Sequence, residues 1–447
     1  MSIKSLIILG AGESGVGAAV LAKKQGYQVF VSDQGEIAEN FQSTLQKYQI
    51  EFESKKHEKV FNYSPELVIK SPGIPDKAEA VKYFAKKSIP IISEIEFAGR
   101  YTNSKMICIT GSNGKTTTTL LTYHLLKSAG LNVGIAGNIG NSLALQVAEE
   151  PHDYYVVELS SFQLDGMFDF RADIAILLNI TPDHLDRYDY KFENYIASKF
   201  RISQNQNSKN SFVINKDDEV INKFCSVKEF GAKTYFLSNI GNASAVGSEK
   251  NLEFIFDDKR MTISTDFLTI QGLHNRYNAL AAGTAAILVG LTQKQIELGF
   301  STFKNAEHRL EKVAIINGVQ YINDSKATNV DSVWYALESM KTPVIWIVGG
   351  VDKGNDYSVL MNFVDKKVKG IICLGKDNSK LQGEFGAKGK LFFSTDDLAK
   401  AISKAKEWGS EGDTVLLSPA CASFDLFKNY IDRGNQFKSI VNQVANL

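Results

Sequence analysis

Short apolar runs alternate with stretches of helical spacing along the first ninety residues of the chain. The runs stand at residues 6–9, 29–31 and 67–69, and apolar positions recur at helical spacing in the segments between them. This alternation is typical of parallel strands that are joined by crossover helices. The pattern therefore predicts an α/β domain with a parallel sheet at the start of the chain.

Two further series of apolar runs follow. The second begins at residues 106–109 and passes through a more polar, strand-rich region up to about residue 266, before an Ala-rich helix over residues 277–289. The third opens near Val313 and again alternates strand-like runs with helical stretches. The other strands predicted in these two series are residues 154–157, 174–178, 344–348, 371–374 and 415–417.

The chain has 447 residues, and single cores seldom grow much beyond about 250 residues. We therefore expect three α/β domains with boundaries near residues 95 and 305. Residues 1–95 and 306–447 are predicted to be Rossmann-like, and residues 96–305 are predicted to form a parallel sheet with extra strands.

Composition and charge narrow the classes of partner. Fifty basic residues balance fifty acidic ones, so no net field recruits nucleic acid or an anionic membrane. The chain has neither a secretory signal pattern at its start nor an uninterrupted apolar run of about 18 residues. Its four cysteines show no metal-type spacing, which indicates reduced thiols. We expect a cytoplasmic protein, and nothing demands more than a monomer.

A glycine loop follows the first predicted strand. Residues 10–15 (GAGESG) open an Ala-rich helix, and Asp33 ends the next predicted strand. The glycines let backbone amides approach a diphosphate at a helix N-terminus, although the motif alone also fits a turn that binds nothing. Because about ninety residues hold only one half of a dinucleotide site, a nucleoside diphosphate fits better than NAD.

A second phosphate loop lies between the predicted strand 106–109 and a helix. Its backbone amides can wrap phosphate, Lys115 can reach the β- and γ-phosphates, and Thr116 can ligate magnesium. The first glycine of the standard P-loop spacing would fall on Ile109, which is a departure. The context still predicts a P-loop ATPase-type sheet and an ATP site made by Gly111, Ser112, Asn113, Gly114, Lys115, Thr116 and Thr117.

Three more residues are candidates for chemistry near this loop. Glu158 ends a predicted strand and His184 follows another, so both lie at the carboxyl edge of the sheet, where they could hold magnesium. Singly, each is equally well explained as a hydrogen-bonded buried histidine or a helix-capping carboxylate. Lys199 lies in a helix predicted over residues 192–204, and by itself it is best explained as a solvated lysine on the helix surface.

The ordered set of motifs resembles the Mur ligases, three-domain enzymes of bacterial cell-wall precursor assembly. The segments that carry the resemblance are residues 110–117, Glu158, residues 179–188, 272–278, 308–309, 323–329 and 418–423. The domain with the glycine loop resembles that of the members that add L-alanine and D-glutamate. Residues 349–354 (GGVDKG) stand where the member that adds diaminopimelate or lysine would carry an Asp-Asn-Pro-Arg-type motif, and residues 418–429 (SPACASFDLFKN) are very similar to the member that adds D-glutamate. The ordered set is far more specific than any one motif.

The resemblance implies an activity and a role for each matching residue. The expected reaction joins D-glutamate to UDP-N-acetylmuramoyl-L-alanine through an acyl phosphate, with ATP and two magnesium ions, in peptidoglycan precursor synthesis. Lys115, Glu158, His184 and Lys199 are the catalytic residues it implies, and Thr116, Glu158, His184 and carbamylated Lys199 the metal ligands. The implied binding residues are Asn275, Asn278, Arg309, Asp324 and Lys326 for ATP; Ser14, Asp33, Ser71, Gly73 and Asn138 for the UDP substrate; and Thr328, Lys353, Ser423 and Tyr430 for D-glutamate. Gln34 departs from the family pattern, where a hydroxyl can face the uridine end.

Three alternatives remain open from the sequence. A related ligase that accepts another amino acid or a folate would be separated by substrate screening. A nucleotide-sugar sensor without catalysis would release no phosphate with any acceptor. A nicotinamide-dependent dehydrogenase is supported by the first glycine loop alone and leaves Lys115 and Thr116 without a role.

Overall fold

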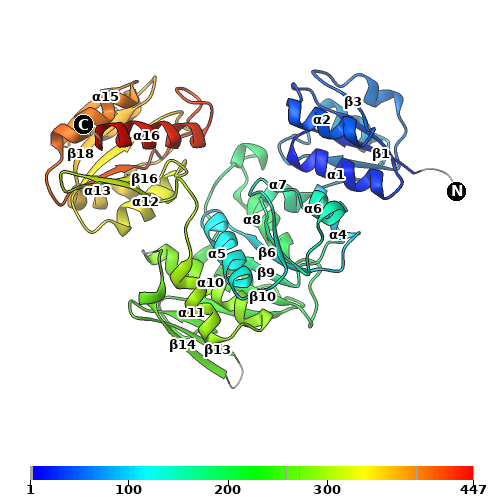
Figure 1. Cartoon of the computed structure of the whole chain (residues 1–447), viewed down its shortest axis with the longest axis horizontal. Coiled ribbons are helices and arrows are strands. Elements are labelled where there is room, and N and C mark those ends of the chain that lie inside the picture. Colours follow the sequence, from blue (N-terminus) through cyan, green and yellow to red (C-terminus); the bar gives the residue numbers. More distant parts are fainter. Residues whose placement is uncertain (1–3, 257–258, 271, 389, 446–447) are drawn as a thin grey trace. The chain divides into compact units, whose positions relative to one another are not determined.

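The computed structural model describes residues 4–256, 259–270, 272–388 and 390–445. The chain divides into two compact units, which contain three helix-covered sheets (Figure 1). Unit 1 comprises Met1–Thr269 and Arg276–Phe303, and unit 2 comprises Ile270–Asn275 and Lys304–Leu447. The predicted α/β fold class is confirmed, because parallel strand pairs dominate all three sheets.

The first sheet of unit 1 is parallel throughout, in the order β3-β2-β1-β4-β5. Its strands and helices are β1 (Ser5–Leu9), α1 (Glu13–Lys24), β2 (Gln28–Ser32), α2 (Glu39–Lys47), β3 (Glu51–Glu53), the 3₁₀ turn η1 (Lys59–Asn62), β4 (Leu67–Lys70), α3 (Glu79–Lys86) and β5 (Ile91–Ile92). Leu6 and Ile8 of β1 pack with α1, whereas Ile7 and Leu9 pack with α3. Residues 6–9 of this strand are therefore all apolar, because both faces of the sheet are covered.

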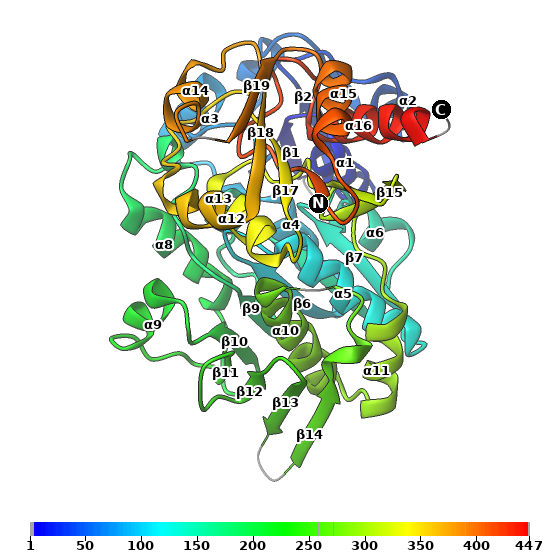
Figure 2. The ribbon, with the colours of Figure 1, turned by 90° about the vertical axis from the view of Figure 1, so that its left-hand side faces the viewer.

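The second sheet of unit 1 has nine strands in the order β14-β13-β12-β11-β10-β9-β6-β8-β7. The strands are β6 (Lys105–Thr110), β7 (Val133–Gly137), β8 (Tyr154–Glu158), β9 (Ile174–Leu177), β10 (Ser211–Asn215), β11 (Lys233–Ser238), β12 (Ala245–Gly247), β13 (Asn251–Phe256) and β14 (Lys259–Ser264). Strands β6 to β12 pair in parallel, and β12, β13 and β14 pair antiparallel at the end of the sheet (Figure 2). The strand-rich polar region predicted up to about residue 266 is this part of the sheet.

Helices cover the second sheet and connect it to the first. They are α4 (Glu94–Gly99), α5 (Lys115–Ser128), α6 (Leu143–Glu149), α7 (Ser161–Asp165), α8 (Phe192–Phe200), α9 (Glu219–Cys225), α10 (Leu273–Val289) and α11 (Gln293–Thr302), with 3₁₀ turns η2 (Leu185–Arg187), η3 (Arg201–Ser203) and η4 (Thr265–Phe267). Helix α1 packs closely on α6: a Cβ at Gly17 would lie 1.9 Å from the hydroxyl oxygen of Ser142. Only glycine permits this approach.

The sheet of unit 2 has the order β15-β16-β20-β17-β18-β19, and among its described strands only the β15–β16 pair is antiparallel. The elements are β15 (Glu311–Ile316), β16 (Val319–Asn323), α12 (Val330–Ser339), β17 (Val344–Val348), η5 (Ser358–Leu360), α13 (Met361–Lys367), β18 (Val368–Leu374), α14 (Ser379–Phe385), β19 (Leu391–Thr395), α15 (Leu398–Trp408), β20 (Thr414–Leu417) and α16 (Tyr430–Ala445). Trp346 packs with α12 and α13 on one face, and Ile345 and Ile347 pack with α15 and α16 on the other (Figure 1).

The predicted elements agree with the structure in most places. Strand β17 coincides with the predicted residues 344–348, and α10 begins four residues before the predicted start at residue 277. The helix predicted over residues 192–204 ends at Phe200 and passes into η3, as helix ends commonly tighten to 3₁₀ geometry. Among the described residues, no helix combines the length and the hydrophobicity needed to cross a membrane.

Candidate active site

The polar motifs lie at the carboxyl ends of parallel strands in all three sheets. In each sheet they flank a point where the strand order changes direction: between β1 and β4, between β6 and β9, and between β17 and β20. Ligands of open α/β folds bind in the crevice that such a reversal creates.

A hollow of about 590 Å³ lies at the carboxyl edge of the first sheet, within the range of about 300–1,000 Å³ typical of small-molecule sites. Four of the five predicted UDP-substrate residues line it: Ser14, Asp33, Ser71 and Gly73. The fifth, Asn138, follows β7 and is not among the lining residues. The loops after β1, β2 and β4 therefore meet at one hollow.

Asp33 and Gly10 fix the shape of this hollow. The Asp33 carboxylate accepts the amide of Ala11 at 2.6 Å and that of Gly35 at 2.7 Å, which anchors the glycine loop. Gly10 has a φ of +93°, and a Cβ there would lie 2.5 Å from the hydroxyl oxygen of Ser71. That hydroxyl is buried and has no hydrogen-bond partner among the described residues. A polar ligand atom would satisfy it.

Two residues of this hollow were missed by the sequence analysis. His57 lines it, and its Nδ1 lies 2.7 Å from the hydroxyl oxygen of Ser32. Lys77 lines it too and is exposed, which places a positive charge beside any diphosphate. Both occur in polar stretches of ordinary surface character, so no local signal marks them.

The phosphate loop after β6 is held in shape from two neighbouring elements. Asn179, just beyond β9, accepts the amide of Asn113 at 2.8 Å and donates to its carbonyl oxygen at 3.0 Å. Gly111 and Gly114 have φ values of +154° and +82°, and a Cβ at Gly114 would lie 2.5 Å from Oδ1 of Asn278 in α10. The loop thus leads straight into α5, whose first residue is Lys115. Exposed amides at a helix start favour phosphate.

Two lysines converge on this loop. Lys115 donates from Nζ to the carbonyl oxygens of Gly111, at 2.7 Å, and Ser112, at 2.8 Å. Lys199 is 1% exposed and also donates to the Gly111 carbonyl oxygen, at 2.8 Å. Burial, followed by the charge of Lys115, lowers the pKa of Lys199 well below its usual range. The charged form of this amine is therefore less favoured than that of a solvated helix lysine.

A buried carboxylate lies on the adjacent strand. Glu158 is 2% exposed, and its Oε1 accepts a hydrogen bond from Nδ2 of Asn138 at 2.8 Å. Its Oε2 is buried and has no hydrogen-bond partner among the described residues. An unsatisfied carboxylate oxygen beside a phosphate loop suits a magnesium ion. Asn138, predicted to contact the UDP substrate, is thus bound to a predicted metal ligand.

His184 lies after β9 in the left-handed region, with a φ of +53°. Its ring packs edge-on against Phe162 at 5.2 Å, and its side chain is 46% exposed. Across the described ranges no three His, Cys, Asp or Glu side chains form a ready-made metal cage. The predicted ligands are of mixed kinds, and Mg²⁺ commonly takes one or two carboxylates and completes its shell with phosphates and water. The carboxylate of Glu158 beside the phosphate loop fits this kind of coordination.

In unit 2 the loops after β16, β17 and β20 form one surface. The amide of Ala420 donates to the carbonyl oxygen of Ala327 at 2.9 Å, and that of Val351 donates to Ala422 at 2.8 Å. The predicted D-glutamate residues belong to this surface or to the helix beside it: Thr328, Lys353, Ser423 and Tyr430. Ser423 is buried and Lys353 is exposed.

Arg433 of α16 ties these three loops together and was missed by the sequence analysis. It is 1% exposed, and its guanidinium donates to the carbonyl oxygen of Ser325 at 2.8 Å and to its hydroxyl at 2.9 Å. It also donates to the carbonyl oxygens of Cys421, at 3.3 Å, and Gly349, at 3.4 Å. Burial lowers the pKa of Arg433 to about 10, so the group stays charged.

Two of the predicted ATP residues of unit 2, Asp324 and Lys326, belong to the loop after β16. Asp324 accepts the hydroxyl of Ser418 at 2.8 Å, and burial raises the pKa of its carboxyl to about 7. Nζ of Lys326 lies 3.8 Å from the ring centre of Tyr430, a cation–π contact. Arg309 is partly buried, and its charge adds to burial in lowering the pKa of His274 to about 4. Asn275 is buried in the first turn of α10.

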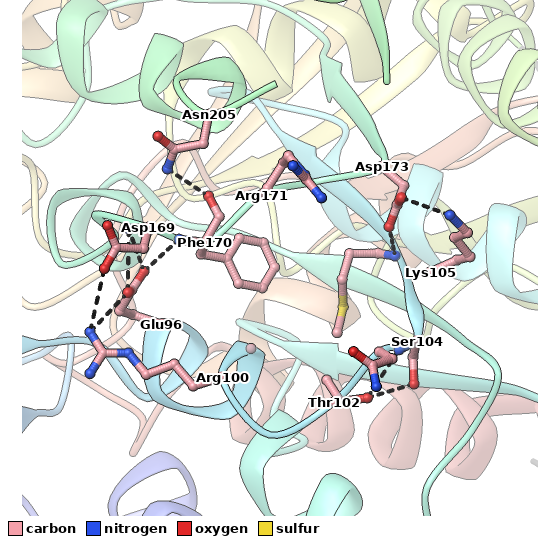
Figure 3. A pocket seen from close by; sticks show the side chains of 13 residues that line it. Glu96, Arg100, Thr102, Ser104, Lys105, Asp169, Phe170, Arg171, Asp173 and Asn205 are labelled. Carbon is pink, nitrogen blue, oxygen red and sulfur yellow. Dashed lines mark hydrogen bonds and ion pairs between the residues drawn. The ribbon is translucent and has the colours of Figure 1, made fainter. Parts of the chain in front are cut away.

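A second hollow in unit 1, of about 540 Å³, lies at the opposite end of β6 (Figure 3). Glu96 of α4 is buried there, and its carboxylate accepts the amides of Phe168, Asp169 and Phe170 and pairs with Arg100 at 3.1 Å. No residue predicted for the site lines this hollow. Glu96 therefore serves to hold a loop.

Three family models match successive parts of the chain. Residues 5–80 match the MurD N-terminal domain, residues 109–286 the Mur ligase middle domain, and residues 308–421 the Mur ligase glutamate ligase domain. Relatives named UDP-N-acetylmuramoylalanine–D-glutamate ligase are similar along their whole length. The one from Bacteroides fragilis is 51% identical over 99% of this chain and 100% of its own, and that from Porphyromonas gingivalis is 51% identical over 98% of each.

Solved structures share the fold at low identity. A pseudomurein peptide ligase type C from Methanothermus fervidus aligns with a TM-score of 0.63 and 19% identity, over 99% of this chain and 100% of its own. UDP-N-acetylmuramate-alanine ligase MurC from Thermotoga maritima aligns with a TM-score of 0.62 and 18% identity, with the same coverage.

The three sheets, each with polar loops at its carboxyl edge, and these matches define one class of protein: the chain belongs to the Mur ligase family. The resemblance noted in the sequence is confirmed. The particular branch is that of the relatives named UDP-N-acetylmuramoylalanine–D-glutamate ligase, since both the N-terminal match and the full-length similarity are to that member.

Proposed function

We propose that this chain is an ATP-dependent ligase that adds D-glutamate to UDP-N-acetylmuramoyl-L-alanine in peptidoglycan precursor synthesis, releasing ADP and phosphate. The observation that carries the proposal is the group of Lys115, Lys199 and the unsatisfied Glu158 oxygen around one phosphate loop. The full-length relatives of this chain bear the name of that activity.

The work is divided along the chain in this proposal. Residues 1–95 bind the UDP end of the substrate, with Asn138 as a further contact. Residues 96–305 bind ATP, and residues 306–447 bind D-glutamate and contribute Arg309, Asp324 and Lys326 to nucleotide binding. Ser14, Asp33, Ser71 and Gly73 share one hollow, which supports the first assignment. Thr328, Lys353, Ser423 and Tyr430 adjoin one surface of unit 2, which supports the third. The enzyme is proposed to act in the cytoplasm as a monomer, without nucleic acid or membrane.

The chemistry starts from a substrate carboxylate, which is a poor electrophile. Its oxygen attacks the γ-phosphorus of ATP to give an acyl phosphate and ADP, and the amine of D-glutamate then displaces phosphate from the acyl carbon. Lys115 stabilises the charge that develops on the transferred phosphoryl group. Asn275, Asn278, Arg309, Asp324 and Lys326 hold the rest of the nucleotide in this proposal.

Magnesium ions, when bound, would supply positive charge to the phosphates and to the tetrahedral oxyanion. Thr116, Glu158 and His184 are the proposed ligands, and Asn138 orients the Glu158 carboxylate through its hydrogen bond. Lys199 is proposed to be carbamylated: its neutral amine attacks the carbon of CO₂, a C–N bond forms and one proton leaves. The product is anionic where Lys199 itself would be cationic, and so can ligate a second magnesium ion.

Phosphate release tests the proposal directly. The purified protein is given Mg-ATP and UDP-N-acetylmuramoyl-L-alanine, with D-glutamate, L-glutamate, L-alanine or L-lysine in parallel. We expect turnover with D-glutamate alone. Turnover with another amino acid would keep the ligase chemistry but refute the assignment of D-glutamate, and phosphate release with none of them would refute the ligase.

A further inference from the structure

Ser142, the residue that caps α6, is held by two carboxylates from different elements. Its amide donates to Oε1 of Glu13, the first residue of α1, at 3.2 Å. Its hydroxyl donates to Oε1 of Glu94, the first residue of α4, at 2.8 Å. The amide of Ala144 donates to the same Glu94 oxygen at 2.6 Å. The start of α6 is thus bound to both helices at once.

Glu94 is an unusual group for such a junction. It is 3% exposed, and its Oε2 is buried without a hydrogen-bond partner among the described residues. Burial raises the pKa of Glu94 to about 7, and the negative charge of Glu13 from α1 acts in the same direction. Burial of this carboxyl costs free energy that burial of an apolar side chain would not. Its presence at the junction therefore points to a specific role for the oxygen that accepts hydrogen bonds from α6.

The junction lies between two parts of the proposed active site. Glu13 lines the 590 Å³ hollow beside Ser14. Just before Ser142, residues 138–141 form a tight loop that is closed by a hydrogen bond of 2.8 Å from the Gly137 amide to the Asn141 carbonyl oxygen. That loop begins with Asn138, which is bound to Glu158 through both its amide and its side chain. A displacement of α6 would therefore be transmitted to Glu158.

We propose that Glu94 is a positioning residue that holds the start of α6, and with it the Asn138 loop, against α1, so that the bound UDP-linked substrate and Glu158 keep a fixed spacing. Glu94 touches neither substrate nor metal in this proposal and acts through Ser142. The inference rests on the proposed function, because it takes the hollow after β1 as the UDP site. The close packing at Gly17 supports it, since α1 and α6 are in direct contact beside Ser142.

The test compares Glu94→Ala with Glu94→Gln in the full-length protein. Binding of UDP-N-acetylmuramoyl-L-alanine is measured by calorimetry without ATP or D-glutamate, and KM values are measured for that substrate and for ATP. Glu94→Ala is expected to weaken substrate binding about tenfold, the equivalent of one buried hydrogen bond to a carboxylate, and to leave the KM for ATP within about twofold. Glu94→Gln keeps the acceptor oxygen and is expected to bind within about threefold of wild type.

Glu96→Ala is the matched control. Glu96 lies two residues away in the same helix and is equally buried, but its carboxylate holds the loop of Phe168 to Phe170 at the other hollow (Figure 3). We expect a lower unfolding temperature with unchanged substrate affinity. If Glu94→Ala does not fold, Ser142→Gly removes the hydroxyl bound to Glu94 while keeping a residue that helix N-caps tolerate, and it should weaken substrate binding in the same way.

Several outcomes would overturn the inference. A folded Glu94→Ala or Ser142→Gly protein with wild-type substrate affinity would do so, as would an equal loss in Glu94→Gln. The same loss of affinity in Glu96→Ala would show that the loss in Glu94→Ala comes from general destabilisation and not from the contact with Ser142. Because affinity is measured without D-glutamate, absence of turnover in the wild type would refute the proposed function without deciding this inference.

Discussion

Lys199 and Lys115 donate hydrogen bonds to one and the same acceptor, the carbonyl oxygen of Gly111. Two ammonium groups on one oxygen repel each other, and Lys199 is the one that is fully buried. Burial, followed by the charge of Lys115, therefore lowers the pKa of Lys199 well below its usual range. Because the unprotonated amine is the form that reacts with CO₂, this lowered pKa favours the proposed carbamylation of Lys199.

Lys199→Ala is expected to lower kcat by about 100-fold, as loss of a metal-shell group commonly does. In the wild type, ¹³C-bicarbonate should give a carbamate NMR signal that disappears in Lys199→Ala and fades as the pH falls, because protonated amine does not react with CO₂. Removing dissolved CO₂ should reduce wild-type activity, and bicarbonate should restore it. An active Lys199→Ala enzyme, or a wild type without the signal, would refute carbamylation.

Lys115→Met tests the phosphate loop. Loss of a cation that stabilises the transferred phosphoryl group should lower kcat by about 100- to 1,000-fold, or roughly 3–4 kcal/mol. Phosphate release with saturating substrates measures it. Lys105→Met is the control: Lys105 opens β6 at the far end of the same strand and forms an exposed pair with Asp173, so its loss should change little. Equal activity of both variants would remove Lys115 from the mechanism.

Glu94→Gln should change how stability depends on pH. The folded-state pKa of Glu94 is raised to about 7 from 4.5, so the folded protein binds this proton more tightly than the unfolded chain. Its stabilising contribution is complete below about pH 4.5 and is lost as the pH rises through 7. Relative to wild type, Glu94→Gln should therefore gain up to about 3 kcal/mol in unfolding free energy between pH 4.5 and 8.

Urea unfolding at several pH values measures this gain. Asp324 has a pKa raised to about 7 as well and titrates in the same range, so the difference between the two proteins is the relevant quantity. A difference that stays constant with pH would mean that Glu94 ionises normally in the folded protein.

Arg433→Met should damage both stability and amino-acid binding. The substitution leaves the carbonyl oxygens of Ser325, Gly349 and Cys421 without their donor, at a cost of about 3 kcal/mol or more. Because the loops around Lys353 and Ser423 lose their common anchor, the KM for D-glutamate should rise more than the KM for ATP. Denaturant unfolding and steady-state kinetics measure the two effects.

Arg171→Met provides the control for Arg433. Arg171 is an exposed arginine of unit 1, and substitution of an exposed side chain usually stays within about 0.5 kcal/mol. An Arg433→Met protein that matched this control in stability and in both KM values would show that the three loops hold their shape by themselves.

The fold could be read from the sequence where a local pattern determines it. Residues 344–348 form β17 as predicted. A strand that is buried on both faces is a continuous apolar run, so the local sequence shows it without knowledge of the neighbouring strands. The helix predicted over residues 192–204 was wrong at its end, where the chain tightens after Phe200. Such an ending depends on tertiary contacts, here those of Arg201 with the carbonyl oxygens of Leu164 and Met167.

The candidate site was predictable in part for the same reason. Gly111, Gly114 and Lys115 fall within one short segment of the sequence, so their spacing reveals the loop. Arg433 and His57 gave no such signal, since each acts on partners that are distant in the chain: Ser325 lies 108 residues from Arg433, and Ser32 lies 25 residues from His57. Lys199 looked like a surface residue because its helix carries polar neighbours, and only the fold buries it.

Two loops of unit 2 that follow neighbouring strands differ in how far their side chains are exposed. Residues 349–354 follow β17 and residues 418–423 follow β20. Lys353 in the first of these loops is exposed, whereas Cys421 and Ser423 in the second are buried. In the proposed function, substitution of the exposed Lys353 should therefore change amino-acid binding with little loss of stability, whereas substitution of the buried Ser423 should affect both. The loop after β17 is thus a place where the sequence of unit 2 can vary around an unchanged sheet, and solved structures that are only 15–19% identical to this chain share its fold.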